Sequence, residues 1–240
     1  MKSDDLDDGV LSLVMGVEER LQRNPREALE FADRAAPESA AHPEARLARA
    51  RALVAARGAS AGRRVLELLV NQEPQFAEAR HELALVYEEL GDHASAAREL
   101  LAVRRLDADE DLAEGFDLAE IEGRIASCAE RVLSELPPKF RDRLASIPVL
   151  IEDRPSEALV REGFDPRSLG LFEGAEHVDR ELGADVPSPT RIVLYAANLA
   201  AFVDPEDEQE LAREVEITLL HEIGHYFGLG ETELEALGLG

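Results

Sequence analysis

The chain has 240 residues, of which 45% are hydrophobic, and it carries a formal net charge of −25. This charge argues against nucleic acid or an anionic membrane surface as a partner. The single cysteine, Cys128, excludes an intrachain disulfide and a cysteine-based metal site. The N-terminal segment lacks the basic-then-apolar order of a signal peptide, and the nearly apolar run 192–203 is too short to span a bilayer. We therefore expect a cytoplasmic protein.

The first half of the chain has the composition and spacing of paired helices. From residue 11 to about 135, Ala, Leu, Arg and Glu dominate and apolar residues recur at helical intervals. The stretch AEARHELALVYEELGDHASAARELLAVRRLDAD (77–109) resembles a tetratricopeptide repeat, in which a tight turn at Gly91-Asp92 separates two helices. A second copy begins 34 residues earlier, at Pro43, and a third, weaker copy runs through NPREALEFADRAAP (24–37). A generic antiparallel helical bundle is the alternative interpretation.

These patterns predict three regions. Residues 1–110 form the helical repeats, residues 111–135 a connecting helix, and residues 136–240 a second domain. In the repeats, the small residues Ala84 and Ala96 would let helices approach closely. No catalytic pattern occurs in the repeats, so their expected role is to bind a protein or peptide.

After Pro138 the composition shifts towards glycine, proline and β-branched residues. Short strands are predicted at 147–151, 169–174 and 191–195 (RIVLY). The last long helix is predicted to begin after Asp204, a good N-cap, and to end at Gly228. One face of this helix is expected to pack on a small sheet.

The motif HEIGHYFGLGE, residues 221–231, is on the final turns of that helix. His221 and His225 are four residues apart, so both imidazoles project from one face, where they can ligate one metal ion. Glu222 would take a proton from a metal-bound water, because Zn²⁺ lowers the pKa of that water to about 7.

A catalytic zinc site needs three protein ligands and an open position. The third ligand should follow the glycine turn, where Glu231 completes HExxHxxGxxE and where Glu233 and Glu235 are the alternatives. Two histidines at a helix end without a metal are the other interpretation of the motif.

Residues 136–240 resemble the minimal zincin-like metallopeptidases, a family of small bacterial HExxH proteins. The stretches that carry the resemblance are LPPKFRDRL, IPVLIEDRPS, LGLFEG, RIVLY and EVEITLLHEIGHYFGLGETELEALG. The resemblance implies an α+β fold with a short mixed sheet, an HExxH helix with zinc, Glu231 as third ligand and hydrolysis of peptide bonds. The whole chain is thus predicted to be an all-α repeat domain followed by a small zincin-like domain.

Two further expectations follow from zincins in general. RIVLY would be the edge strand that pairs with an extended substrate, and Tyr195, Tyr226 or His177 would donate to the oxyanion. The rival function is a non-catalytic interaction protein with a structural zinc, whose open position would be filled by a fourth ligand such as Glu233 or Glu235.

Overall fold

A computed structural model describes residues 8–115, 118–174, 190–204 and 207–239. These residues divide into two compact units. Unit 1 comprises residues 1–110 together with 157–163, and unit 2 comprises residues 111–156 together with 164–240. None of the described helices is both long enough and apolar enough to cross a membrane.

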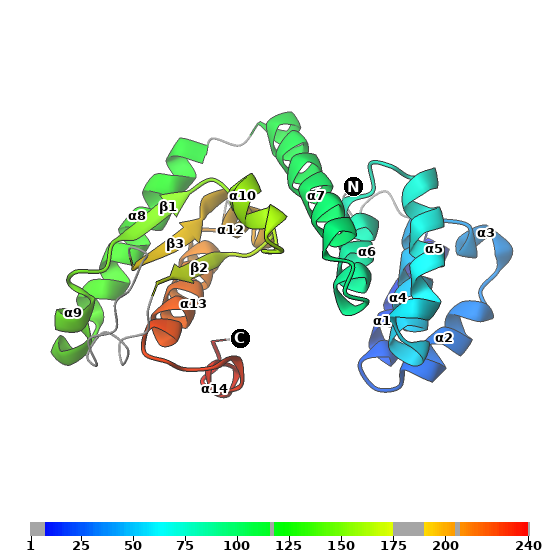
Figure 1. Cartoon of the computed structure of the whole chain (residues 1–240), viewed down its shortest axis with the longest axis horizontal. Helices are drawn as coiled ribbons and strands as arrows, with labels where there is room; N and C mark the ends of the chain where they lie inside the picture. Colours follow the sequence, from blue (N-terminus) through cyan, green and yellow to red (C-terminus); the bar gives the residue numbers. More distant parts are fainter. Residues whose placement is uncertain (1–7, 116–117, 175–189, 205–206, 240) are drawn as a thin grey trace. The chain divides into compact units, whose positions relative to one another are not determined.

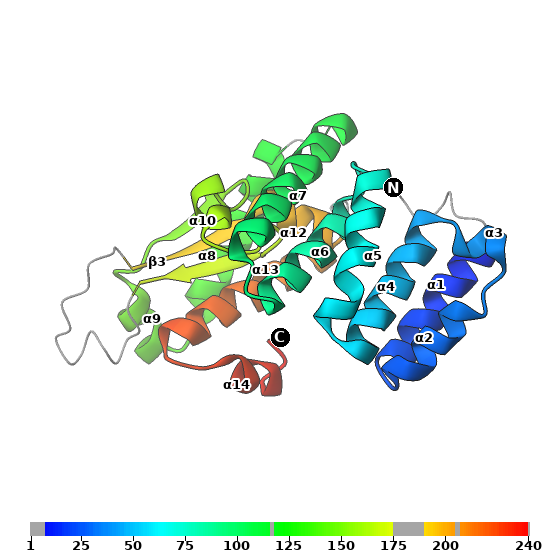
Figure 2. The same ribbon diagram turned by 45° about the vertical axis from the view of Figure 1, so that its right-hand side comes forward.

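Unit 1 is entirely helical in its described part. Its helices are α1 (Asp8–Leu21), α2 (Pro25–Asp33), α3 (Pro37–Ala40), α4 (Pro43–Arg57), α5 (Ala59–Gln72), α6 (Ala77–Glu89), most of α7 (His93–Glu114) and α10 (Glu157–Arg161). In Figures 1 and 2, α4, α5 and α6 run side by side. Helices α2, α5 and α7 begin at residues 25, 59 and 93, so their starts are 34 residues apart, which agrees with the predicted period. That the helices of unit 1 form tetratricopeptide repeats stays a prediction.

Small residues fill the centre of unit 1. Ala84 and Ala96 are fully buried, as the prediction of close helix approach requires. Between them, the chain turns at Gly91, whose φ of 74° is the left-handed conformation that favours glycine. The Asp92 side chain then accepts a hydrogen bond from the Ser95 amide at 3.1 Å, so the predicted turn is confirmed.

Unit 2 combines helices with a three-stranded sheet. Its elements are α8 (Leu118–Glu135), α9 (Pro138–Leu144), β1 (Val149–Glu152), β2 (Gly170–Glu173), β3 (Arg191–Tyr195), α12 (Ala196–Phe202), α13 (Glu208–Tyr226) and α14 (Glu231–Ala236). The strand order is β1-β3-β2, with β1 parallel and β2 antiparallel to β3. The predicted class, an N-terminal helical region followed by a small mixed sheet with an HExxH helix, is confirmed.

The core of unit 2 lies between the sheet and two helices. In Figures 1 and 2, α8 lies beside β1 and α13 beside β2, and both helices contribute to one hydrophobic cluster. Ile192 and Leu194 of β3 enter this cluster together with Val215 and Leu219 of α13, and all four are fully buried. The apolar face predicted for the last long helix therefore packs on the sheet.

Three details differ from the predictions. RIVLY is the central strand β3, paired on both edges, so its predicted role as the edge strand is wrong.

Helix α13 begins at Glu208 rather than after Asp204, because Asp207 caps it and accepts hydrogen bonds from the amides of Gln209 and Glu210. The connecting helix predicted over 111–135 begins at Leu118, because α7 continues to Glu114 and the chain turns at Gly115 with φ of 73°.

Candidate metal centre

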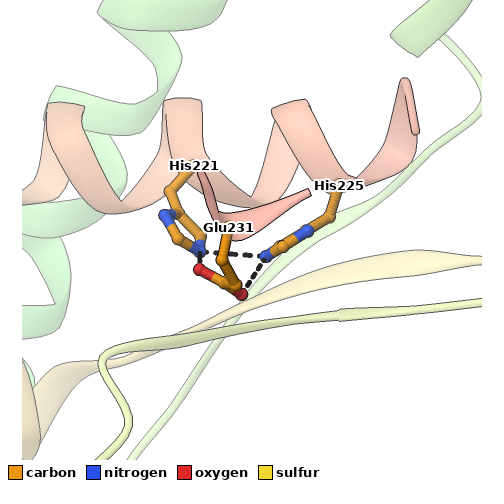
Figure 3. Close-up of side chains that lie close together, drawn as sticks. All are labelled: His221, His225 and Glu231. Carbon is orange, nitrogen blue, oxygen red and sulfur yellow. Dashed lines mark hydrogen bonds and ion pairs between the residues drawn. The ribbon is translucent and has the colours of Figure 1, made fainter. Parts of the chain in front are cut away.

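The two histidines of the motif meet on the last turns of α13. Their four-residue spacing places both rings on one helix face, and the Nε2 atoms of His221 and His225 lie 2.9 Å apart. Figure 3 shows both rings pointing towards Glu231, which comes from the following helix. The Glu231 carboxylate lies 3.2 Å from Nε2 of His225 and 3.7 Å from Nε2 of His221.

A glycine turn brings Glu231 to the histidines. At the end of α13, Gly228 has φ of 83° and its amide donates to the His225 carbonyl at 2.9 Å. The amide of Leu229 donates to the carbonyl of Gly224 at 3.0 Å. This pair of bonds is a Schellman motif, which reverses the chain with a left-handed glycine. Helix α14 starts three residues later, at Glu231.

The two imidazoles and the Glu231 carboxylate lie at separations close to those of a tetrahedral zinc site. With metal–ligand distances of about 2.0–2.1 Å, tetrahedral geometry places neighbouring ligand atoms about 3.3 Å apart. The two Nε2 atoms lie 2.9 Å apart, and the Glu231 carboxylate lies 3.2 Å from Nε2 of His225 through Oε1 and 3.7 Å from Nε2 of His221 through Oε2. In the described part of the chain, no other group of three His, Cys, Asp or Glu side chains converges in this way. Two imidazoles and one carboxylate are also ligands that zinc prefers.

The second nitrogen of each histidine supports the same assignment. Nδ1 of His221 lies 2.6 Å from the Leu239 carbonyl, and Nδ1 of His225 lies 3.1 Å from the Leu229 carbonyl. A carbonyl can only accept, so each Nδ1 carries a hydrogen and Nε2 of each ring is the nitrogen that remains to ligate a metal. The two Nε2 atoms lie 2.9 Å apart, which is close enough for both to ligate one ion. The residues present therefore fit a zinc ion.

Glu222 lies beside the ligands in a buried setting. It is 7% exposed, and the Phe172 amide of β2 donates a hydrogen bond to its carboxylate. Burial raises the pKa of Glu222, and the neighbouring His221 and His225 oppose this shift. Strand β2 approaches so closely at Gly170 that a Cβ there would lie 3.0 Å from Oε1 of Glu222. Glu222 is thus held in one place by the strand above it.

An open cavity of about 490 Å³ lies over these side chains. Besides the motif, β2 and the loop before it form its wall. The lining residues are Phe164, Ser168, Gly170, Leu171, Phe172, Gly174, His221, Glu222, His225 and Glu231. The strand at the edge of the sheet beside the metal centre is therefore β2, the strand that sequence reasoning did not choose.

A buried polar network holds the loop in this wall. The Asn198 amide donates to the carbonyls of Pro166 and Ser168 at 2.8 and 2.7 Å. Its oxygen accepts from the buried Arg154 guanidinium at 2.9 Å, and Arg154 also pairs with Asp111. Sequence reasoning missed this network, because its members are far apart in the chain and form no motif.

The remaining predicted residues lie elsewhere. Tyr195 is fully buried at the end of β3, and its hydroxyl has no hydrogen-bond partner among the described residues. Tyr226 is in the core, with its hydroxyl 3.5 Å from the Arg143 carbonyl. Neither tyrosine lines the cavity, and His177 lies outside the described residues.

Of the two alternative ligands, Glu233 accepts a hydrogen bond from the Gly230 amide at 3.0 Å, and Glu235 is not part of the metal-binding group.

The comparison with known families agrees with this geometry. Residues 144–240 match the zincin-like metallopeptidase family, and this segment contains the whole sheet, the HExxH helix and α14. The resemblance predicted for the second half of the chain is thereby confirmed. The match covers less than half of the chain, and the helices of unit 1 before residue 110 lie outside it. No curated protein matches the sequence.

Proposed function

We propose that the protein is a zinc-dependent peptidase in which His221, His225 and Glu231 hold the metal and Glu222 is the general base. One observation carries this proposal: three ligand atoms converge within 4.8 Å of one another at the floor of an open cavity, next to a buried carboxylate. The family match of residues 144–240 supports it and implies a protein or peptide substrate.

The chain supplies the groups that hydrolysis of a peptide bond needs. When bound, zinc polarises the scissile carbonyl and makes water acidic enough to deprotonate near neutral pH. A Glu222 carboxylate oxygen accepts the proton of a water in the cavity and returns it to the leaving amine. The raised pKa of Glu222 makes it a stronger base, and the Phe172 amide keeps the carboxylate in position. The cavity leaves room for the substrate beside the three ligands.

We also propose that the helices of residues 1–110 bind the polypeptide to be cut. Their paired arrangement with a 34-residue period supports this role, because stacked helical pairs present extended binding surfaces. We keep the proposed division of the chain into regions 1–110, 111–135 and 136–240, with one addition. Helix α10 belongs to the third region by sequence but packs in unit 1, where Val160 is buried with Ala84 and Leu100.

Glu222→Gln tests the peptidase assignment. The wild-type protein, loaded with one equivalent of zinc, is incubated with a mixed peptide library and cleavage is followed by mass spectrometry. The variant should retain zinc but lose about 10²–10⁴-fold in rate. Glu235→Gln makes the same chemical change outside the metal-binding group and should cleave like the wild type. Tight zinc binding without any cleavage that depends on Glu222 would instead identify a structural zinc site.

A further inference from the structure

The segment that contains α14 contacts both ring nitrogens of His221, one from each end of the helix. Glu231, its first residue, faces Nε2 of His221 at 3.7 Å. Leu239, three residues after its last residue, places its carbonyl 2.6 Å from Nδ1 of the same ring. We propose that docking of α14 on α13 sets the zinc affinity, with Leu234 and the Leu239 carbonyl as positioning groups. This inference rests on the zinc site of the proposed function.

A second glycine turn delivers the Leu239 carbonyl. Gly238 has φ of 77°, and the amides of Gly238 and Leu239 donate to the carbonyls of Glu235 and Leu234, both at 3.0 Å. This is again a Schellman motif. The segment after α13 is therefore a short helix between two glycine turns: the first places the carboxylate ligand, and the second places the acceptor that fixes the tautomer of His221.

One side chain anchors this helix. Leu234 is fully buried, and it is the one side chain of α14 that is buried. It lies directly over Gly224, where an added Cβ would come within 2.4 Å of Leu234 Cδ2. The glycine in HEIGH thus makes room for α14 to dock. By contrast, Leu237, the C-cap residue directly after the helix, is 65% exposed.

A six-residue helix does not form on its own in water, so α14 depends on this anchor. When α14 leaves α13, the site loses its third ligand and the acceptor at Nδ1 of His221 together. Zinc affinity and docking are then thermodynamically linked, and zinc must stabilise the docked helix by as much as docking strengthens zinc binding. Supporting groups of this kind change metal affinity by about 10- to 100-fold.

Zinc affinity of matched leucine variants tests the proposal. The full chain is titrated with zinc in competition with a chromophoric chelator. Leu234→Ala should weaken binding by about 10- to 100-fold, whereas Leu237→Ala should bind as the wild type does. In hydrogen exchange, zinc should protect the amides of residues 229–239 in the wild type and much less in Leu234→Ala. Equal affinities of Leu234→Ala and the wild type would overturn the proposal.

A second pair of variants covers the case in which Leu234→Ala does not fold. Gly238→Ala introduces a side chain at a positive φ with no atom within 4 Å, so it perturbs only the turn that carries the Leu239 carbonyl. Gly91→Ala is the control, since it also places a Cβ at a positive φ, 74°, with no atom within 4 Å, but in unit 1. Weaker zinc binding is expected for Gly238→Ala alone, and unchanged binding in both would overturn the role of Leu239.

These measurements are independent of hydrolysis. If zinc binds and depends on Leu234 while Glu222→Gln changes no cleavage, the docking proposal holds and the peptidase proposal fails. If cleavage depends on Glu222 but zinc affinity is the same in all four variants, the peptidase proposal holds and the docking proposal fails. A wild-type protein that takes up no zinc at all would overturn the site on which both rest.

Discussion

Gly170→Ala should slow catalysis without touching a zinc ligand. Gly170 lies on β2 directly above Glu222, and its φ is not positive, so alanine fits the backbone. The new methyl group would lie 2.9 Å from Thr218 Cγ2 and 3.0 Å from both Cγ and Oε1 of Glu222. Ordinary contacts of such a carbon begin near 3.4 Å, so either the glutamate or the strand must move by several tenths of an ångström.

The size of the effect follows from this displacement. A misplacement of about 1 Å can cost about 10²-fold in rate, so a shift of roughly half that distance should lower kcat by about 10-fold. Overpacking a core costs about 1–3 kcal/mol, and the smaller conformational freedom of alanine in the unfolded chain offsets about 0.4–1 kcal/mol of it. We therefore expect a net loss of about 1–2 kcal/mol in the free energy of unfolding, which leaves the protein folded.

Three measurements separate this effect from damage to the metal site: kcat on the best library peptide, zinc affinity by chelator competition, and urea denaturation. Zinc affinity should stay within about threefold of the wild type, because the ligands lie outside the new contact. Gly123→Ala is the control, since nothing lies within 4 Å of its Cβ and alanine favours its helix, α8. Wild-type kcat in Gly170→Ala would refute the claim that β2 positions the general base.

Three other predictions concern the metal and the buried polar groups. Zinc at about 100 times its Kd should raise the free energy of unfolding by about 2.7 kcal/mol; an equal urea midpoint with and without a chelator would contradict a native-state site. Asn198→Leu should lower this free energy by about 3 kcal/mol, because it leaves buried partners unsatisfied, whereas Asn71→Leu at an exposed helical position should change little. Tyr195→Phe removes a buried hydroxyl without a partner among the described residues and should leave stability equal or higher by up to about 1 kcal/mol. A large loss of kcat in Tyr195→Phe would restore its earlier assignment as an oxyanion donor.

The convergence of His221, His225 and Glu231 could be predicted because local geometry brings them together. The spacing of His221 and His225 fixes their proximity as soon as the segment is a helix. Glu231 follows within six residues of His225, and the positive φ of Gly228 is the only special conformation on the way. Contacts between residues this close in the sequence can be predicted without knowledge of the tertiary fold.

The order of the strands could not be predicted in the same way. RIVLY was expected at the edge, although four of its five residues, 192–195, are buried. An uninterrupted apolar run such as IVLY, residues 192–195, is typical of a strand covered on both faces. This run was the sequence signal that favoured a central position. Strand β2 lies at the edge beside the motif, yet its sequence, GLFE, gives no indication of that. Strand order depends on long-range pairing, which a single strand's sequence does not encode.

Backbone groups account for the other part of the site that the sequence conceals. The Phe172 amide at Glu222 and the Leu239 carbonyl at His221 are present in every residue type, so no motif marks them. Their identity depends on where β2 and α14 pass α13. Asp204 and Asp207 pose a related difficulty, since both are good N-caps and only the packed helix selects the second.

The two glutamates of the motif show how the surroundings, rather than the residue type, assign the roles. Glu222 is 7% exposed beneath β2, where desolvation raises its pKa and favours accepting a proton. The side chain of Glu231 is 70% exposed at the start of α14, where its carboxylate faces both histidines. A residue at position 222 as exposed as Glu231 would be a weaker base, because it would lack the desolvation that raises the pKa of Glu222. The proposed division of roles therefore depends on two elements: β2, which passes close to Glu222 at Gly170, and α14, which packs through Leu234 against Gly224.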